Sequence, residues 1–122
     1  MRALLFVGIG GGIGSILRYA ISLFIGRHVP IAFPLGTLLV NISGCFLIGV
    51  IYSIASKYVG FHPEWRLFLI TGICGGYTTF STFSYDGLIL LKQGSNFYFM
   101  LYVLGSVILG LLATFAGAAI FK

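Results

Sequence analysis

The sequence predicts an all-α integral membrane protein with four membrane-spanning helices, the third of them broken near its middle. Of the 122 residues, 59% are hydrophobic and 7% are charged, and the mean hydropathy is +1.11. A soluble domain of this size buries only about 60–70% of the surface that its unfolded chain exposes, so lipid is needed to cover the rest. Four stretches also reach the length of about 20 apolar residues that a spanning helix requires.

The expected helices span residues 3–25, 33–56, 65–91 and 97–121. The connections between them are short, so consecutive helices should be antiparallel neighbours, and residues 1–122 should form a single four-helix transmembrane domain. The first stretch is too long for the apolar part of a signal peptide, and no cleavage site of small residues follows it. We therefore expect it to remain as the first helix.

The first helix contains one charged residue, Arg18, about two-thirds of the way along it. A charge at this depth is expensive, and it is usually paired or close to an interface. We favour a structural role, in which Arg18 either anchors backbone carbonyls or extends its long side chain to the headgroups. An electrostatic attraction for anions is the functional alternative.

Small residues four positions apart are typical of membrane helices that pack closely. Such sets are Gly8 with Gly12, Gly10 with Gly14, Gly72 with Gly76, and the stripe of Ser106, Gly110, Thr114 and Ala118. The pattern leaves open whether each set packs within one subunit or between two.

The second helix contains an amide in its central part, Asn41, one turn after Thr37. An amide side chain can both donate and accept hydrogen bonds. It could make an interhelical hydrogen bond and nothing more. Because the third helix carries many polar groups at membrane depth, we favour a role for Asn41 in lining a pathway.

The third helix is interrupted by polar residues at 75–84, where two glycines precede five Ser and Thr hydroxyls and two phenylalanines. Polar side chains and irregular backbone at this depth are tolerated only inside protein or beside a water-filled cavity. Gly72, Gly75 and Gly76 predict a break just before the hydroxyls. A broken helix exposes carbonyls that can coordinate a cation and creates a helix N-terminus that favours an anion.

Phe80 and Phe83 are three residues apart, so in a helix they share a face. The edge of a phenylalanine ring is partly positive, so two inward edges could contact an anion. The hydroxyls of Ser81, Thr82 and Ser84 could donate hydrogen bonds to the same anion. Simple helix packing is the alternative for the phenylalanine pair alone.

The positive charges give a weak signal for membrane orientation. They divide into Arg2, Lys57, Arg66 and Lys122 on one side and Arg27 and Lys92 on the other. Cytoplasmic loops normally carry a clear excess of Lys and Arg, so we hypothesise insertion in both orientations and pairing of two antiparallel copies. The net charge of +5 contains no basic run, so nucleic acid is not an expected partner.

Three motifs resemble those of the CrcB/Fluc family of small fluoride channels. They are Gly-Gly-Ile-Gly-Ser-Ile-Leu-Arg-Tyr at 11–19, Pro-Leu-Gly-Thr-Leu-Leu-Val-Asn-Ile-Ser-Gly at 34–44, and Gly-Ile-Cys-Gly-Gly-Tyr-Thr-Thr-Phe-Ser-Thr-Phe-Ser at 72–84. The resemblance covers essentially the whole chain. It implies a dual-topology homodimer of antiparallel subunits in the plasma (inner) membrane, with two pores that export fluoride passively and so lower its toxicity.

The resemblance also implies roles for individual residues. Phe80 and Phe83 would be the pair whose edges contact fluoride, and Asn41 would be the pore asparagine. The carbonyls of Gly75 and Thr78 would hold a structural Na⁺ on the dimer axis. The remaining polar pathway would consist of Ser81, Thr82, Ser84, Thr37, Tyr102, Ser106 and Thr114.

A small dual-topology, proton-coupled drug exporter is the alternative function. That chemistry requires a carboxylate at the membrane centre, whereas the first helix carries Arg18, for which the family resemblance implies a structural role. Asp86 is the acid within a span, but it lies roughly 9 Å from the end of its helix. A purely structural assembly protein would not explain the hydroxyls. An enzyme is not expected, because the sequence lacks a Ser-His-Asp set, paired carboxylates and a metal-ligand cluster.

Overall fold

The computed structural model describes residues 1–31, 33–58 and 60–121, and in these residues all regular structure is helical. The elements are α1 (Arg2–His28), α2 (Leu35–Lys57), α3 (Pro63–Arg66), the π-helix η1 (Leu67–Cys74), α4 (Gly75–Tyr77), α5 (Phe80–Lys92) and α6 (Asn96–Ala119). The predicted all-α class is confirmed.

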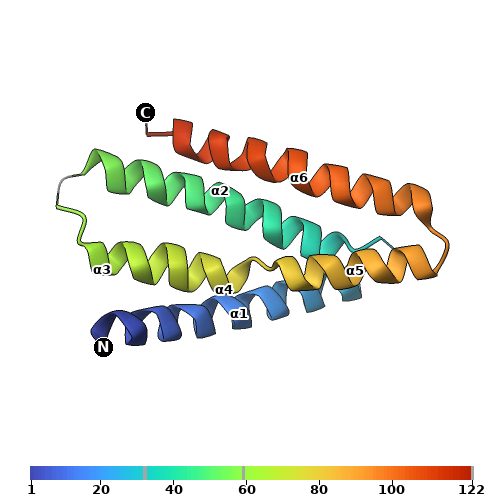
Figure 1. Ribbon diagram of the computed structural model, residues 1–122, viewed down its shortest axis with the longest axis horizontal. Coiled ribbons are helices and arrows are strands. Elements are labelled where there is room, and N and C mark those ends of the chain that lie inside the picture. The colour runs from blue at the N-terminus through green and yellow to red at the C-terminus, as the bar shows by residue number, and fades with distance from the viewer. Residues whose placement is uncertain (32, 59, 122) are drawn as a thin grey trace.

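The elements form four rods that run back and forth along the long axis of the molecule (Figure 1). Three rods are single helices, α1, α2 and α6, and each is long and apolar enough to cross a membrane. The third rod is α3, η1, α4 and α5 in succession. Both termini lie at the same end as the α2–α3 connection, as an even number of crossings requires (Figure 1).

Prolines lie at or close to the ends of several helices, and this explains why these ends differ from the expected bounds. α1 continues to His28, three residues beyond the expected end, and stops just before Pro30. α2 begins at Leu35, two residues later than expected, because a residue that precedes a proline is disfavoured in helical conformation and Pro34 is the N-cap. Pro63 occupies the first position of α3, where its missing N–H costs nothing.

Glycines allow α1 to pack directly on the third rod. A Cβ at Gly10 would lie 2.6 Å from the carbonyl oxygen of Phe68, and a Cβ at Gly14 would overlap the carbonyl of Ile73. From the opposite side, a Cβ at Gly76 would overlap Gly11. These glycines therefore serve close packing within one subunit, as small residues do in membrane helix pairs.

The third rod is broken near its middle, as predicted, but the glycines are not the break. Gly75 and Gly76 are helical, and the interruption falls at the next positions, where Thr78 (φ −88°, ψ 154°) and Thr79 (φ −153°, ψ 128°) are extended. Gly76 thus permits close packing with α1, whereas Thr78 and Thr79 interrupt the helix.

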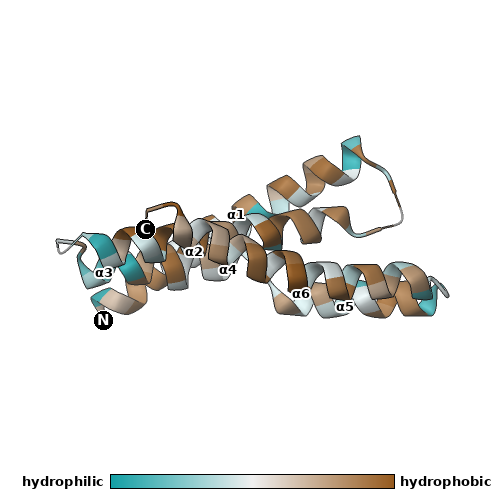
Figure 2. Cartoon of the chain, turned by 90° about the horizontal axis from the view of Figure 1, so that it is seen from above, coloured by the Kyte–Doolittle hydropathy of each residue, from teal (hydrophilic) through white to brown (hydrophobic). Residues whose placement is uncertain are grey.

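The surface agrees with a membrane environment. Figure 2 shows hydrophobic residues along the middle of the rods and hydrophilic residues gathered mainly at their ends. Large apolar side chains on α1 and α6 are exposed, among them Ile16 at 71% and Phe115 at 65%. In a membrane these side chains would contact lipid or another subunit, so the chain is a multi-pass membrane protein.

Candidate ion pathway

Asn41 of α2 holds the break from one side. Its Oδ1 accepts a hydrogen bond from the N–H of Thr79 at 3.0 Å, and its Nδ2 donates to the carbonyl of Thr79 at 3.3 Å. In an unbroken α-helix the N–H of Thr79 would instead donate to the carbonyl of Gly75. Asn41 therefore satisfies the donor that the break releases.

The residues after the break start a new helix inside the bundle. Thr79 is the N-cap of α5, and its Oγ1 accepts from the N–H of Thr82 at 3.3 Å and lies 3.1 Å from the Oγ of Ser81. A threonine N-cap satisfies one of the free N–H groups of the first turn. The positive end of the α5 dipole thus lies beside the break, where it favours an anion.

The residues before the break expose carbonyl oxygens. The carbonyl of Gly76 accepts from Arg18 Nε at 3.2 Å and from Ser15 Oγ at 3.5 Å. The carbonyls of Gly75 and Thr78, in contrast, accept no hydrogen bond from the described residues. Unpaired backbone carbonyls in a broken membrane helix are ligands of the kind that bind Na⁺, so these two fit such an ion.

A second contact from α2 supports the break, and the sequence analysis missed it. The hydroxyl of Tyr77, which is 8% exposed, lies 2.9 Å from the Oγ of Ser43, and Ser43 Oγ also approaches the carbonyl of Val40 at 3.0 Å. Gly44 leaves room for the ring of Tyr77 and the methyl of Thr78. Ser43 could have indicated this contact, because it is a polar residue two positions after Asn41 on α2, the helix that faces the break.

The two phenylalanines adopt different environments. Their ring centroids are 5.6 Å apart, so they share a face of α5 as their spacing predicts. Phe83 also packs on Tyr102 of α6, with centroids 5.0 Å apart, whereas Phe80 is 78% exposed. Ser81 and Ser84 are exposed as well. In the single subunit, part of the α5 face that carries these rings and hydroxyls is therefore exposed.

Tyr102 connects α6 to the middle of α5. It is completely buried, and its hydroxyl donates to Asp86 Oδ2 at 3.2 Å. Asp86 and Thr37 line a cavity of about 220 Å³ near the α1–α2 connection. Phe33 packs edge-on against the ring of Tyr102, with centroids 5.7 Å apart. Phe83, Tyr102, Asp86 and Thr37 thus gather on the α1–α2 connection side of the break.

The two candidates further along α6 are separated from this group. Ser106 is one turn after Tyr102, and its buried Oγ has no hydrogen-bond partner among the described residues. Thr114 is three turns after Tyr102, roughly 18 Å along the helix, and its hydroxyl donates to the carbonyl of Gly110 at 3.1 Å. Ser106 therefore has a free hydrogen-bonding group at the bundle interior, while the Thr114 hydroxyl is already occupied.

These features define a multi-pass helical membrane protein whose third span is interrupted and lined with hydroxyl and aromatic groups. Residues 5–118 match the family model described as CrcB-like protein, Camphor Resistance (CrcB), and the chain belongs to this family.

Several curated relatives have the name "Fluoride-specific ion channel FluC". The protein of Rhizobium meliloti is 47% identical over 122 residues, covering 100% of this chain and 98% of the relative. That of Flavobacterium psychrophilum is 43% identical with the same coverage. That of Phocaeicola vulgatus is 48% identical over 117 residues, which are 96% of each chain.

Proposed function

We propose that this protein is a fluoride-selective ion channel that lets F⁻ leave the cytoplasm passively and so lowers fluoride toxicity. Relatives named as fluoride-specific channels are 43–48% identical over nearly the full length. The structural observation that carries the proposal is the break at Thr78 and Thr79. It places a capped helix N-terminus, hydroxyls and two phenylalanine rings together at membrane depth.

The chemistry of the break suits fluoride. Fluoride is small and strongly hydrated, so a selective path needs hydrogen-bond donors and positive ring edges close enough to replace its water. Conduction also requires binding weak enough to release the ion. Phe80 and Phe83 supply the edges, and Ser81, Thr82 and Ser84 supply hydroxyls on the same short helix. Chloride is larger and a poorer hydrogen-bond acceptor, so it gains less in such a path.

A second subunit is part of the proposal. Phe80, Ser81 and Ser84 are exposed, so one subunit covers the α5 face from one side only. We propose that an antiparallel copy covers it and that the homodimer contains two pathways, each continuing to Asn41, Thr37, Tyr102 and the α6 positions Ser106 and Thr114.

The distribution of charge supports insertion in both orientations. Arg2, Lys57 and Arg66 lie at the end of the molecule that holds the N-terminus, and Arg27 and Lys92 lie at the other end (Figure 1). Lys122 is outside the described residues. Such a small excess gives a weak orientation signal. We propose the plasma (inner) membrane as the location, where two opposed subunits can insert side by side.

We further propose that a structural Na⁺ binds the carbonyls of Gly75 and Thr78 on the dimer axis. The ion would supply positive charge that holds the carbonyls of the break in place. The residues of this chain do the positioning. Asn41 accepts the N–H of Thr79, which would otherwise compete with the ion for the carbonyl of Gly75. Arg18 binds the neighbouring carbonyl of Gly76.

The drug-exporter alternative is not favoured. A proton-coupled exporter needs a carboxylate that is free to exchange a proton and a cation near the membrane centre. Asp86 lies at the middle of α5, and its Oδ2 accepts a hydrogen bond from Tyr102. The first helix supplies Arg18, which binds the carbonyl of Gly76, and no acid that could exchange a proton.

Efflux from liposomes that contain the purified full chain tests the proposed function. With a potassium ionophore present to balance charge, a fluoride electrode should record rapid efflux while a chloride electrode records almost none. Fluoride efflux without the ionophore would indicate proton coupling and contradict a passive channel. No fluoride efflux would overturn the proposal altogether.

A further inference from the structure

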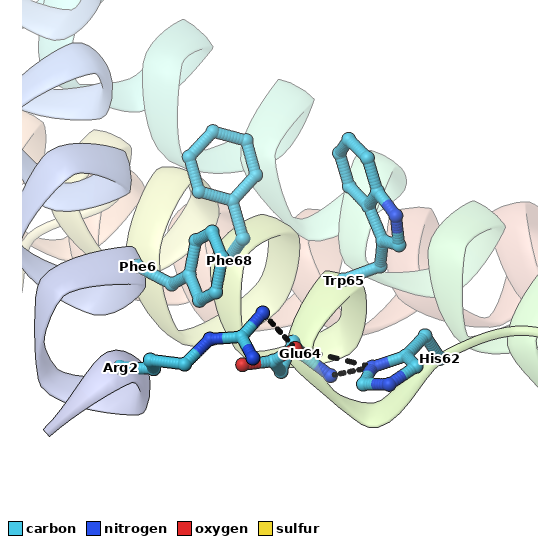
Figure 3. Close-up of a pocket in the computed structure, with 6 residues that line it drawn as sticks. All are labelled: Arg2, Phe6, His62, Glu64, Trp65 and Phe68. Atoms are coloured by element: carbon cyan, nitrogen blue, oxygen red, sulfur yellow. Dashed lines mark hydrogen bonds and ion pairs between the residues drawn. The ribbon is translucent and has the colours of Figure 1, made fainter.

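A pocket at the end of the bundle that holds the N-terminus is separate from the proposed pathway. It has a volume of about 410 Å³, within the range of small-molecule sites, and its lining is mostly apolar. Figure 3 shows its two sides. Phe6, Phe68 and Trp65 are on one side, and Arg2, Glu64 and His62 form a row on the other.

The polar row holds one arginine in place and leaves it accessible. Arg2 Nη2 donates to Glu64 Oε1 at 3.1 Å, and its guanidinium lies 6.0 Å from the ring centroid of Phe6. The N–H of Glu64 donates to His62 Nδ1 at 3.1 Å, so His62 helps to fix the turn that carries Glu64. The Arg2 side chain is 78% exposed, and its remaining N–H groups are directed to no other described residue.

The aromatic side of the pocket offers an apolar surface. Phe68 packs edge-on against both Phe6 and Trp65, with centroids 6.4 Å and 5.8 Å apart. Trp65 is 58% exposed at a helix end, where tryptophan side chains lie at the membrane–water boundary. Large apolar side chains are also exposed further along α1, among them Ile9 and Ile13, so an acyl chain would find more apolar surface there.

We propose that this pocket binds one anionic phospholipid, with the phosphate on Arg2 and an acyl chain against Phe6 and Phe68. Arg2 is paired with Glu64 in the pocket, and the excess of positive charge around the pocket favours an anionic headgroup on the remaining N–H groups of Arg2. Arg66 and Lys57 lie at the same end of the bundle, so the basic residues there outnumber the single acid, Glu64. Guanidinium groups bind phosphate through several N–H donors at once. The lipid would lie at the perimeter of the subunit and would fix the start of α1 to the start of the third rod.

Trp65 provides a direct probe, because it is the only tryptophan in the chain. The full-length protein is reconstituted in phosphatidylcholine vesicles that contain an equal minor fraction of brominated phosphatidylglycerol or brominated phosphatidylcholine, and Trp65 fluorescence is recorded. Bromine atoms quench only within contact range. We expect the anionic lipid to quench as though enriched roughly fivefold around Trp65, the preference that one arginine at an anionic surface can provide. Both leaflets have the same composition, so the result does not depend on subunit orientation.

Three variants separate a site from general surface charge. Arg2→Gln should abolish the preference, whereas Lys57→Gln, at the same end but outside the pocket, should retain most of it. Glu64→Gln should increase the preference, because it removes the negative charge beside Arg2 and keeps the size of the side chain. If Arg2→Gln does not fold, this variant shows whether the preference depends on the charge in the pocket. Three results would overturn the proposal. They are equal quenching by both lipids, a loss of preference in Lys57→Gln as large as in Arg2→Gln, and the absence of quenching by either lipid because protein covers the pocket.

Discussion

Replacing Asn41 with alanine removes both hydrogen bonds that hold Thr79. Interhelical hydrogen bonds in membranes contribute about 0.6 kcal/mol on average, and hydrogen bonds in proteins generally contribute about 1 kcal/mol. The pair therefore stabilises the break by about 1–2 kcal/mol. At the upper value, the equilibrium between a broken and a continuous helix shifts roughly 30-fold toward the continuous helix.

The structure explains where the released N–H would go. Without Asn41, the N–H of Thr79 can return to the carbonyl of Gly75, as in a regular helix. That carbonyl would then be lost as a ligand of the proposed Na⁺, and the N-cap of α5 would be lost with it. We expect Asn41→Ala to reduce fluoride efflux and also to weaken the effect of Na⁺ on stability.

Amide hydrogen exchange over residues 78–82, combined with liposome efflux, tests this account. Asn41→Asp is the matched control, because one carboxylate oxygen can still accept from the N–H of Thr79 while the other repels its carbonyl. We expect Asn41→Asp to reduce efflux by placing a negative charge in an anion path, with the break retained. If Asn41→Ala reduced efflux but left both the exchange and the Na⁺ effect unchanged, Asn41 would line the pathway without positioning the break, contrary to this expectation.

Three further outcomes are expected. Phe80→Ile and Phe83→Ile should both reduce fluoride efflux with the dimer intact. Only Phe83→Ile should also lower the stability of the fold, by about 1 kcal/mol, because its ring packs on α6. Phe97→Ile, at another exposed phenylalanine, is the control and should change neither, and normal efflux in both α5 variants would remove the aromatic site. Tyr77→Phe should lower the thermal midpoint by the equivalent of about 1 kcal/mol through loss of the contact with Ser43, and an unchanged midpoint would make that contact incidental. Replacing Na⁺ with a larger monovalent cation throughout purification should lower the activity or weaken the dimer, whereas indifference to the cation would count against the ion at the break.

The helices could be predicted from the sequence because length and hydropathy alone define a spanning segment. The shift of the α2 start was also accessible, since Pro34 disfavours helix at the residue before it. The position of the break was less accessible. Glycine in a membrane helix can interrupt it or allow another helix to approach, and Gly76 does the second because Gly11 of α1 lies against it.

The sequence indicates which residues are candidates for the site, but it does not indicate their contacts. The sequence identified Asn41 as a polar group at the right depth, but not that both of its hydrogen bonds go to Thr79. Such a contact depends on how α2 lies across the third rod, which no local pattern encodes. The same is true of Tyr77 with Ser43, whose hydroxyls are 34 residues apart in the sequence. Long-range side-chain contacts of this kind needed the structure.

The reversal potential of the purified protein in a planar bilayer tests the central claim most directly. With a tenfold fluoride gradient and equal chloride on both sides, a fluoride-selective channel should reverse at about 59 mV in magnitude, the value for one monovalent ion. A reversal near zero, a value that follows an imposed proton gradient, or no fluoride current would contradict the account of this protein as a passive fluoride channel.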